Sequence, residues 1–294
     1  MHRVSPKVLA LLALLTLVWG TNWPLFRIAL DELPVLTFRS ITMIVGVIVL
    51  TVILLARGES FAVPKGKWPA LIAASATNIF IWNVTTALAV LYIPSGHASV
   101  LSYTMPLWVA LLGFVVFGQR LTGRLLAALL IGATAVLALM LPNFASYERA
   151  PAGLFWGLFA GFCWAIGTFI VKRTAWSGMG LSLTFWQVMI SLPPILLGAL
   201  VIDGIPDHWP SAKALAATIY TGAIPMALGT ATWFTLVKLL PAQVAALSSI
   251  AIPIVAIVSG VTILHEPLSP LQMVAIASTV VALWLALTPG RGSG

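Results

Sequence analysis

Long apolar runs separated by short polar segments dominate this chain. Cutting it at charge clusters and at proline and glycine breaks leaves ten apolar segments, each close to the roughly 20 residues that a helix needs to cross a bilayer core. The segments are residues 8–30, 35–56, 69–91, 95–117, 121–141, 152–171, 180–202, 213–237, 242–263 and 269–288. A count of nine transmembrane spans would require two of these segments to be merged into one span, and no segment is long enough to support such a merger. The pattern predicts an all-α integral membrane protein with ten transmembrane helices.

The composition excludes most other classes of protein. Hydrophobic residues make up 61% of the chain and charged residues 7%, against roughly 25% charged in soluble domains. Apolar sequence continues from Val8 to Ala29, which is the length of a span and exceeds that of a signal peptide. The single cysteine, Cys163, excludes an internal disulfide framework and a cysteine-based metal site. No HExxH, GxSxG or Walker pattern is present, so we expect no enzyme, no catalytic residue, no metal and no cofactor.

The basic residues predict the orientation of the spans. The chain has 15 basic and 7 acidic residues; because the bases lie in short connections, they indicate topology, and we expect no nucleic-acid partner. With both termini in the cytoplasm, the external connections hold only Arg149 and Lys213, while Arg27 and Arg39 flank the first of them from within their spans. The cytoplasmic segments then hold eleven bases: Arg3, Lys7, Arg57, Lys65, Lys67, Arg120, Arg124, Lys172, Arg173, Lys238 and Arg291. This bias predicts a multi-pass protein of the bacterial inner (plasma) membrane with both termini cytoplasmic.

The chain also matches itself at an offset of 147, half its length of 294 residues. The matching elements are Leu36-Thr37-Phe38 with Leu183-Thr184-Phe185, Pro94 and Pro106 with Pro241 and Pro253, Gln119–Thr122 with Glu266–Ser269, and, with two residues of slippage, Trp19…Arg27 with Trp164…Lys172. These matches predict two repeats, residues 1–147 and 148–294, within one membrane domain. Since each repeat holds five spans, the second must enter from the opposite side. Inverted repeats place a binding site at the bilayer midplane between them.

Aromatic and polar residues near the centres of several spans are the candidates for that site. A central tryptophan has an indole N–H that needs a partner, and a central asparagine needs partners for a whole amide. The substrate-binding candidates are Trp19 and Asn22 in the first span, Asn78 and Trp82 in the third, Ser99 and Tyr103 in the fourth, and Trp164 and Thr168 in the sixth. The alternative is that the tryptophans pack between helices or face lipid, and that the hydroxyls bond their own helix.

Matched proline and basic residues suggest moving parts. Pro106 and Pro253 stand in the middle of their spans, where a proline frees a carbonyl group and kinks the helix. We interpret them as hinge or kink positions, or as passive kinks that make room between the halves. Arg27 and Lys172 lie near span ends and are candidate gates, unless they only extend toward the interface. No acidic residue lies near the centre of a span, so no proton-coupling carboxylate is evident.

The Trp19-Gly20-Thr21-Asn22 opening, its match at Trp164, and Glu266-Pro267-Leu268-Ser269 before the last span resemble the drug/metabolite transporter superfamily. Within it the chain is similar to the EamA-like branch, and most to the YddG-type bacterial aromatic amino-acid exporters, although Gln119 stands where the second repeat has Glu266. The resemblance implies a basket of ten helices in which spans one, three, four, six, eight and nine line a central cavity and spans five and ten sit at the side. Span eight then adds Tyr220, Pro225 and Trp233 as weaker site candidates.

The predicted function is export of amino acids and related metabolites by alternating access, with aromatic and other bulky neutral amino acids favoured. The partners are then the small-molecule substrate and the lipid bilayer, and the protein is a monomer or a homodimer. Without a central carboxylate we expect facilitated diffusion or weak coupling. The alternatives are a multidrug exporter of organic cations, which usually relies on a buried acid, and a channel or lipid-handling membrane protein.

Overall fold

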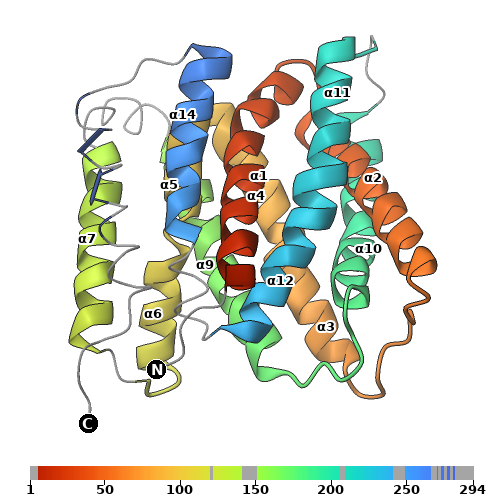
Figure 1. Ribbon diagram of the computed structural model, residues 1–294. Coiled ribbons are helices and arrows are strands. Elements are labelled where there is room, and N and C mark those ends of the chain that lie inside the picture. Colours follow the sequence, from red (N-terminus) through yellow and green to blue (C-terminus); the bar gives the residue numbers. More distant parts are fainter. Residues whose placement is uncertain are drawn as a thin grey trace.

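The computed structural model describes residues 6–119, 122–140, 151–204, 209–240, 249–265, 270, 273–274, 277–278 and 281. Within these residues the regular structure is entirely helical, as predicted, and the helices run side by side in one bundle (Figure 1). Their bounds are α1 (Pro6–Leu30), α2 (Val35–Ala56), α3 (Trp68–Ala74), η1 (Ser75–Ile81), α4 (Trp82–Tyr92), α5 (Ser95–Ser102), α6 (Met105–Val115), α7 (Gly123–Met140), α9 (Pro151–Arg173), α10 (Ser182–Gly198), η3 (Ala199–Asp203), α11 (Ala212–Thr221), η4 (Gly222–Gly229), α12 (Thr230–Leu239), η5 (Ser249–Ala251) and α14 (Ile252–Leu264).

Seven continuous helical runs among the described residues are long and apolar enough to cross a membrane. They are residues 6–30, 35–56, 68–92, 95–115, 151–173, 182–203 and 212–239. Each coincides with a predicted span to within a few residues, and the second agrees at both ends. Two further predicted spans correspond to α7 and to the shorter α14, whereas most of the predicted span 269–288 lies outside the described residues.

The outer surface of the bundle is apolar, as a lipid-facing surface must be. Large aliphatic side chains point outward along the length of α2 and along α10 and η3, where Val52 is 60% exposed and Val201 is 74% exposed. Exposed apolar area of this extent is not tolerated on a monomeric soluble protein. Together with the seven long apolar runs, this surface identifies a multi-pass membrane protein.

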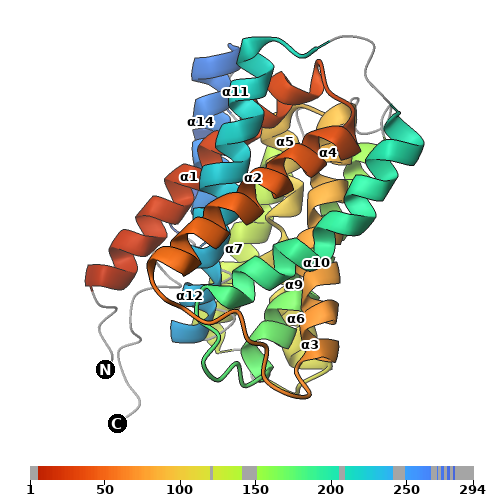
Figure 2. The same cartoon turned by 90° about the vertical axis from the view of Figure 1, so that its right-hand side faces the viewer.

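The first helix of each half packs mainly against the other half. Helix α1 contacts α11, η4, α12 and α14, all from the second half of the chain. Helix α9 contacts α3, η1, α4, α5 and α6, all from the first half. Helices α2 and α10 also pack on each other, and Figure 2 shows them side by side, running obliquely over one face of the bundle. Because the halves interlock in this way, the centre of the bundle lies between them.

Two stretches of the wider π-helix interrupt the long spans close to the centre. Segment η1 begins at Ser75 and segment η4 begins at Gly222, 147 residues later. Pro225 lies inside η4 and has no N–H for the helical ladder, which favours the irregular geometry there. Short π-helical segments inside longer helices occur frequently at functional sites because they redirect side chains.

Two other spans restart next to a proline. Helix α5 ends at Ser102 and α6 begins at Met105, with Pro106 in its first turn. Helix α14 begins at Ile252, with Pro253 in its first turn, directly after the 3-10 segment η5. Proline suits the first turn of a helix because its missing N–H is not needed there. An irregularity in the helical structure therefore lies next to each of the two prolines, and their role as hinges or kinks stays a prediction.

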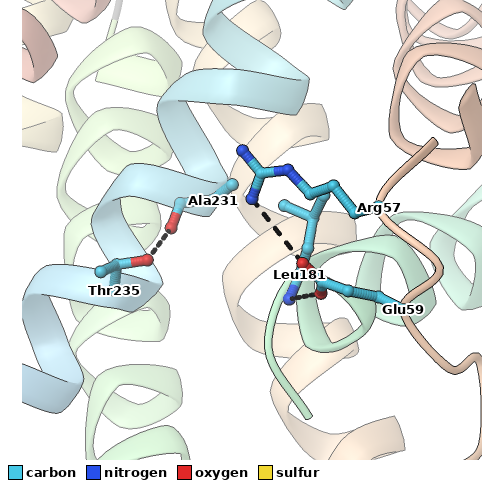
Figure 3. A network of polar contacts seen from close by, with 5 residues as sticks. All are labelled: Arg57, Glu59, Leu181, Ala231 and Thr235. Carbon is cyan, nitrogen blue, oxygen red and sulfur yellow. Dashed lines mark hydrogen bonds and ion pairs between the residues drawn. The ribbon is translucent and has the colours of Figure 1, made fainter. Parts of the chain in front are cut away.

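Polar contacts join the connections at both ends of the bundle. The start of α2 lies at the upper end of Figure 1. There Asp203 accepts hydrogen bonds from the Thr37 N–H at 2.6 Å and from the Thr37 hydroxyl at 2.9 Å, which caps α2. At the lower end, Glu59 forms an ion pair with Arg57 at 3.7 Å and accepts a 3.3 Å hydrogen bond from the Leu181 N–H (Figure 3). The same figure shows the Thr235 hydroxyl bonded to the Ala231 carbonyl within α12. Contacts between the halves therefore exist on both sides of the membrane-spanning region.

Candidate functional site

A cluster of aromatic rings fills the centre of the bundle. The Trp19 ring from α1 lies 5.7 Å from the Trp164 ring of α9 and 5.7 Å from the Trp233 ring of α12, measured between centroids. Trp82 at the start of α4 lies 4.5 Å from Trp164 and 5.9 Å from Tyr103, in the break between α5 and α6. Such edge-on and tilted ring pairs contribute about 0.5–1.5 kcal/mol each beyond their area burial. Helices from both halves thus meet through aromatic contacts.

A small cavity lies against this cluster. Its volume is about 40 Å³, which is enough for a few water molecules but far below the roughly 300–1,000 Å³ of typical ligand pockets. It is lined by residues from α1, α2, η1, α4, the α5–α6 break, α9, α11, η4 and α12: Trp19, Asn22, Trp23, Phe26, Arg39, Ile79, Trp82, Asn83, Tyr103, Trp164, Thr221, Pro225, Met226 and Thr230. The structure therefore shows a nearly closed centre.

Hydrogen bonds tie the first span to the π-helical segment η4 at this cavity. The Trp19 indole N–H donates to the Pro225 carbonyl at 3.1 Å, and the Thr221 hydroxyl donates to the Asn22 side-chain oxygen at 2.8 Å. Gly229 lies directly against the Trp19 ring, so that an added Cβ would come within 2.9 Å of its Cδ1 atom. The wall between α1 and the second half is therefore held by two polar contacts and close packing.

Five of the eight predicted substrate-binding residues line the cavity. They are Trp19, Asn22, Trp82, Tyr103 and Trp164.

Asn78, Ser99 and Thr168 are buried but are not part of the cavity lining. The Ser99 and Thr168 hydroxyls donate to the carbonyls of Gly96 and Trp164 in their own helices, as helical hydroxyls commonly do. Asn78 reaches the Gln187 side chain at 3.5 Å and packs against α9. Among the weaker candidates of span eight, Pro225 lines the cavity and Trp233 belongs to the ring cluster behind it.

Arg39 lines the cavity, and the sequence analysis did not select it. Its side chain is 1% exposed, and its guanidinium lies 4.1 Å above the centroid of the Phe26 ring. The available signal was a single arginine inside an otherwise apolar span, one turn from its start. We had assigned it to the flank of the first external connection, whereas the structure directs it inward.

The two candidate gate residues make equivalent contacts at opposite ends of the bundle. Arg27 donates to the Val90 carbonyl at 3.3 Å and pairs with Asp31 at 3.0 Å, near the end of α4. Lys172 donates to the Val237 carbonyl at 2.9 Å and to the Leu240 carbonyl at 2.7 Å, at the end of α12. Positive groups are favoured at helix C-termini, where carbonyls are unpaired. Val90 and Val237 are 147 residues apart, the offset of the sequence repeat.

A larger hollow of about 500 Å³ lies away from the centre, between α3, α6 and α9. Its lining is aliphatic and aromatic except for Thr174 and Arg173, whose guanidinium stacks 3.6 Å above the Phe117 ring. It lacks the converging polar groups of the central cavity. Because selective recognition of a ligand needs such groups, we take the central cavity as the candidate site.

An all-helical multi-pass bundle with a small aromatic cavity between interlocked halves is the architecture of a membrane transporter. The EamA-like transporter family model matches residues 6–141 and again residues 151–288. The chain belongs to this family, as the sequence motifs had predicted.

Several relatives match over nearly their whole length. A probable amino-acid metabolite efflux pump of Escherichia coli (strain K12) is 26% identical, over 96% of this chain and 95% of the relative. A probable terminal-alkyne amino-acid exporter of Streptantibioticus cattleyicolor is 25% identical, over 98% of this chain and 99% of the relative. The uncharacterized transporter YvbV of Bacillus subtilis is 24% identical, over 96% and 92%. A crystal structure with 19% identity superposes with a TM-score of 0.76 over 97% of both chains, which supports the fold.

Proposed function

We propose that this protein exports amino acids, with aromatic and other bulky neutral ones favoured, by alternating access through the central cavity. The observation that carries the proposal is the cavity lining, which combines six aromatic side chains from both halves with amide groups and one arginine. Aromatic walls suit bulky apolar side chains, and the polar groups suit the charged end of an amino acid. The relatives described as amino-acid exporters support the same substrate class.

The closed centre and the matched irregularities support alternating access between two inverted repeats. A cavity of about 40 Å³ does not admit an amino acid, so helices must separate before substrate enters. The π-helical segments begin at residues 75 and 222, and the helices that carry Pro106 and Pro253 begin at residues 105 and 252. The members of each pair are 147 residues apart, and the two π-helical segments contribute Ile79, Pro225 and Met226 to the cavity lining from the two halves of the chain. Such breaks in corresponding helices are typical of carriers that open alternately to each side.

We propose that the lower end of Figure 1 faces the cytoplasm of a bacterium and that both termini lie there. Helix α1 begins at that end, and the connection between α2 and α3 there carries Arg57, Lys65 and Lys67. The ends of α9 and α12, with Lys172, Arg173 and Lys238, lie at the same end. The connection between α1 and α2, which carries Asp31 and Glu32, lies at the upper end, and Asp203 bonds Thr37 at the start of α2 beside it. This separation follows the positive-inside rule.

The alternative substrate class, organic cations, is disfavoured by Arg39. A second positive charge in a low-dielectric cavity would be repelled by the guanidinium, and none of the described lining residues is acidic. A zwitterionic or anionic substrate is attracted instead. The cavity therefore supports amino acids over cationic drugs.

The test is counterflow in liposomes that contain the purified protein. Vesicles loaded with unlabelled phenylalanine should accumulate labelled phenylalanine saturably, and Trp164→Ala should lower this exchange at least tenfold. Trp108→Ala is the matched control, because Trp108 packs on Phe162, 5.3 Å away, outside the cavity lining. Non-saturable flux would indicate a channel. Equal exchange by the two variants would assign Trp164 to packing alone.

A further inference from the structure

Arg39 is a buried positive charge with an incomplete set of partners. Its side chain makes one hydrogen bond to the described residues, from Nη2 to the Thr86 hydroxyl at 2.9 Å, although a guanidinium has five N–H donors. The buried Nε has no hydrogen-bond partner among the described residues. The rings of Phe26 and Phe38 lie 4.1 Å and 4.9 Å from Cζ and supply only a weak cation–π contribution. An ionised group in such a place ordinarily requires an opposite charge.

The described acidic residues do not supply that charge. Asp31 pairs with Arg27, Glu32 bonds Ser211, Glu59 pairs with Arg57, and Asp203 caps α2. These contacts lie at the two ends of the bundle (Figure 1).

The same cavity offers a further unused donor. The indole N–H of Trp164 is buried and has no acceptor among the described residues. A buried N–H without an acceptor is destabilising, because it has lost its hydrogen bonds to water. Two unsatisfied donors of the cavity lining, the Arg39 Nε and the Trp164 indole, therefore favour a ligand that accepts hydrogen bonds.

We propose that Arg39 binds the carboxylate of the transported molecule, while the rings of Trp19, Trp82 and Trp164 enclose its apolar part. A planar guanidinium matches a carboxylate through two parallel N–H···O bonds, and the unpaired Nε can provide one of them. The inference rests on the proposed transport function and narrows the substrate class to small carboxylates with a bulky apolar group. A free carboxylate is then required for substrate binding, whereas the amino group of the substrate contributes less to binding.

Competition in wild-type protein tests this directly, without any substitution. Labelled phenylalanine counterflow should be inhibited by phenylalanine and by 3-phenylpropanoate, which keeps the carboxylate and lacks the amine. Phenylalaninamide and phenethylamine, which lack the carboxylate, should inhibit at least tenfold less. Equal inhibition by the amide and the acid would overturn the role of Arg39 while the transport function stands. If no amino acid exchanges at all, the transport proposal fails. Carboxylate binding can then still be tested by comparing how strongly 3-phenylpropanoate and phenethylamine quench the tryptophan fluorescence of the protein.

Two variants separate binding from folding. Arg39→Gln should abolish the preference for 3-phenylpropanoate over phenethylamine, and Arg39→Lys should retain it with at least tenfold weaker binding, because a single ammonium cannot form the paired bonds. The matched control is Arg57→Gln, which removes an arginine that is 65% exposed and pairs with Glu59, outside the cavity lining. A control that loses the preference as fully as Arg39→Gln would contradict the proposal. Retention of the preference in Arg39→Gln would do so as well.

Discussion

Replacing Trp19 with phenylalanine tests whether one indole hydrogen bond holds the central cavity closed. The bond joins Trp19 on α1 to the Pro225 carbonyl in η4 at 3.1 Å and is buried. Phenylalanine keeps an aromatic ring beside Trp164 and Trp233, so most of the ring contact survives. The substitution removes the interhelical donor and leaves the Pro225 carbonyl with partners from its own span, the Thr230 N–H and, at 3.5 Å, the Thr230 hydroxyl.

The magnitude follows from the value of such a bond. Interhelical hydrogen bonds in membrane proteins contribute about 0.6 kcal/mol on average, and buried ones in soluble proteins about 0.5–1.5 kcal/mol. A loss of about 1 kcal/mol from the closed state shifts the equilibrium between closed and open cavities about fivefold. We therefore expect Trp19→Phe to raise the open fraction by that factor.

The assay is alkylation of a cysteine placed in the cavity. Asn83 lines the cavity and bonds the Ile79 carbonyl of its own span, and the chain has one native cysteine, so Asn83→Cys in a Cys163→Ala background gives a single reporter. When the cavity recloses faster than a water-soluble maleimide reacts, the labelling rate follows the open fraction. The rate should rise about fivefold in Trp19→Phe.

The matched control is Trp186→Phe. The Trp186 indole donates to the Phe61 carbonyl at 2.7 Å, so this variant loses the same kind of bond outside the cavity. The reasoning is refuted if Trp19→Phe labels at the parental rate. It is refuted equally if Trp186→Phe accelerates labelling as much as Trp19→Phe does.

Two further predictions concern packing and energy coupling. Gly161→Leu should lower the melting temperature in detergent, because an added Cβ would lie 2.7 Å from the Ser102 carbonyl oxygen. Gly123→Leu is the control, because an added Cβ there meets nothing within 4 Å, and it should melt at the parental temperature. Equal melting temperatures of the two variants would contradict the close contact of α9 with the α5–α6 break. Since no acidic residue is among the described residues that line the cavity, phenylalanine counterflow should keep its rate when a pH gradient is imposed across the vesicles, and a severalfold response would indicate proton coupling.

The periodic pattern predicted the spans well because length and hydropathy leave few alternatives in a bilayer. The second span agrees at both ends, residues 35–56, and the proline positions marked both helix restarts. The π-helical character of residues 75–81 was not predictable, since it depends on how the helix packs against α9 and α10. The predicted duplication, with repeats at residues 1–147 and 148–294, stays a prediction that the matched contacts support.

The site was predictable where residue chemistry alone restricted the choice, and not where the direction of a side chain decided it. The indole N–H of a central tryptophan favours a position inside the bundle, and Trp19, Trp82 and Trp164 did converge. Ser99 and Thr168 resembled them in depth, but a hydroxyl satisfied by its own helix gives no signal in the sequence. Arg39 was missed for the converse reason, because an arginine near a span end ordinarily extends toward water.

The position of Arg39 suggests how a substrate acts on the moving parts. Arg39 lies on α2, and α2 packs tightly on η4, where an added Cβ on Gly222 would come within 2.5 Å of the Thr42 carbonyl oxygen. Trp19, which lines the cavity from α1, donates a hydrogen bond to the Pro225 carbonyl in the same segment, η4. Without ligand, closing the cavity buries an uncompensated charge; with a carboxylate bound, closure buries a neutral pair. A ligand shifts a conformational equilibrium only through such a difference in affinity between two states. On this proposal the substrate carboxylate favours the occluded state, and a ligand without it binds the open cavity without promoting closure.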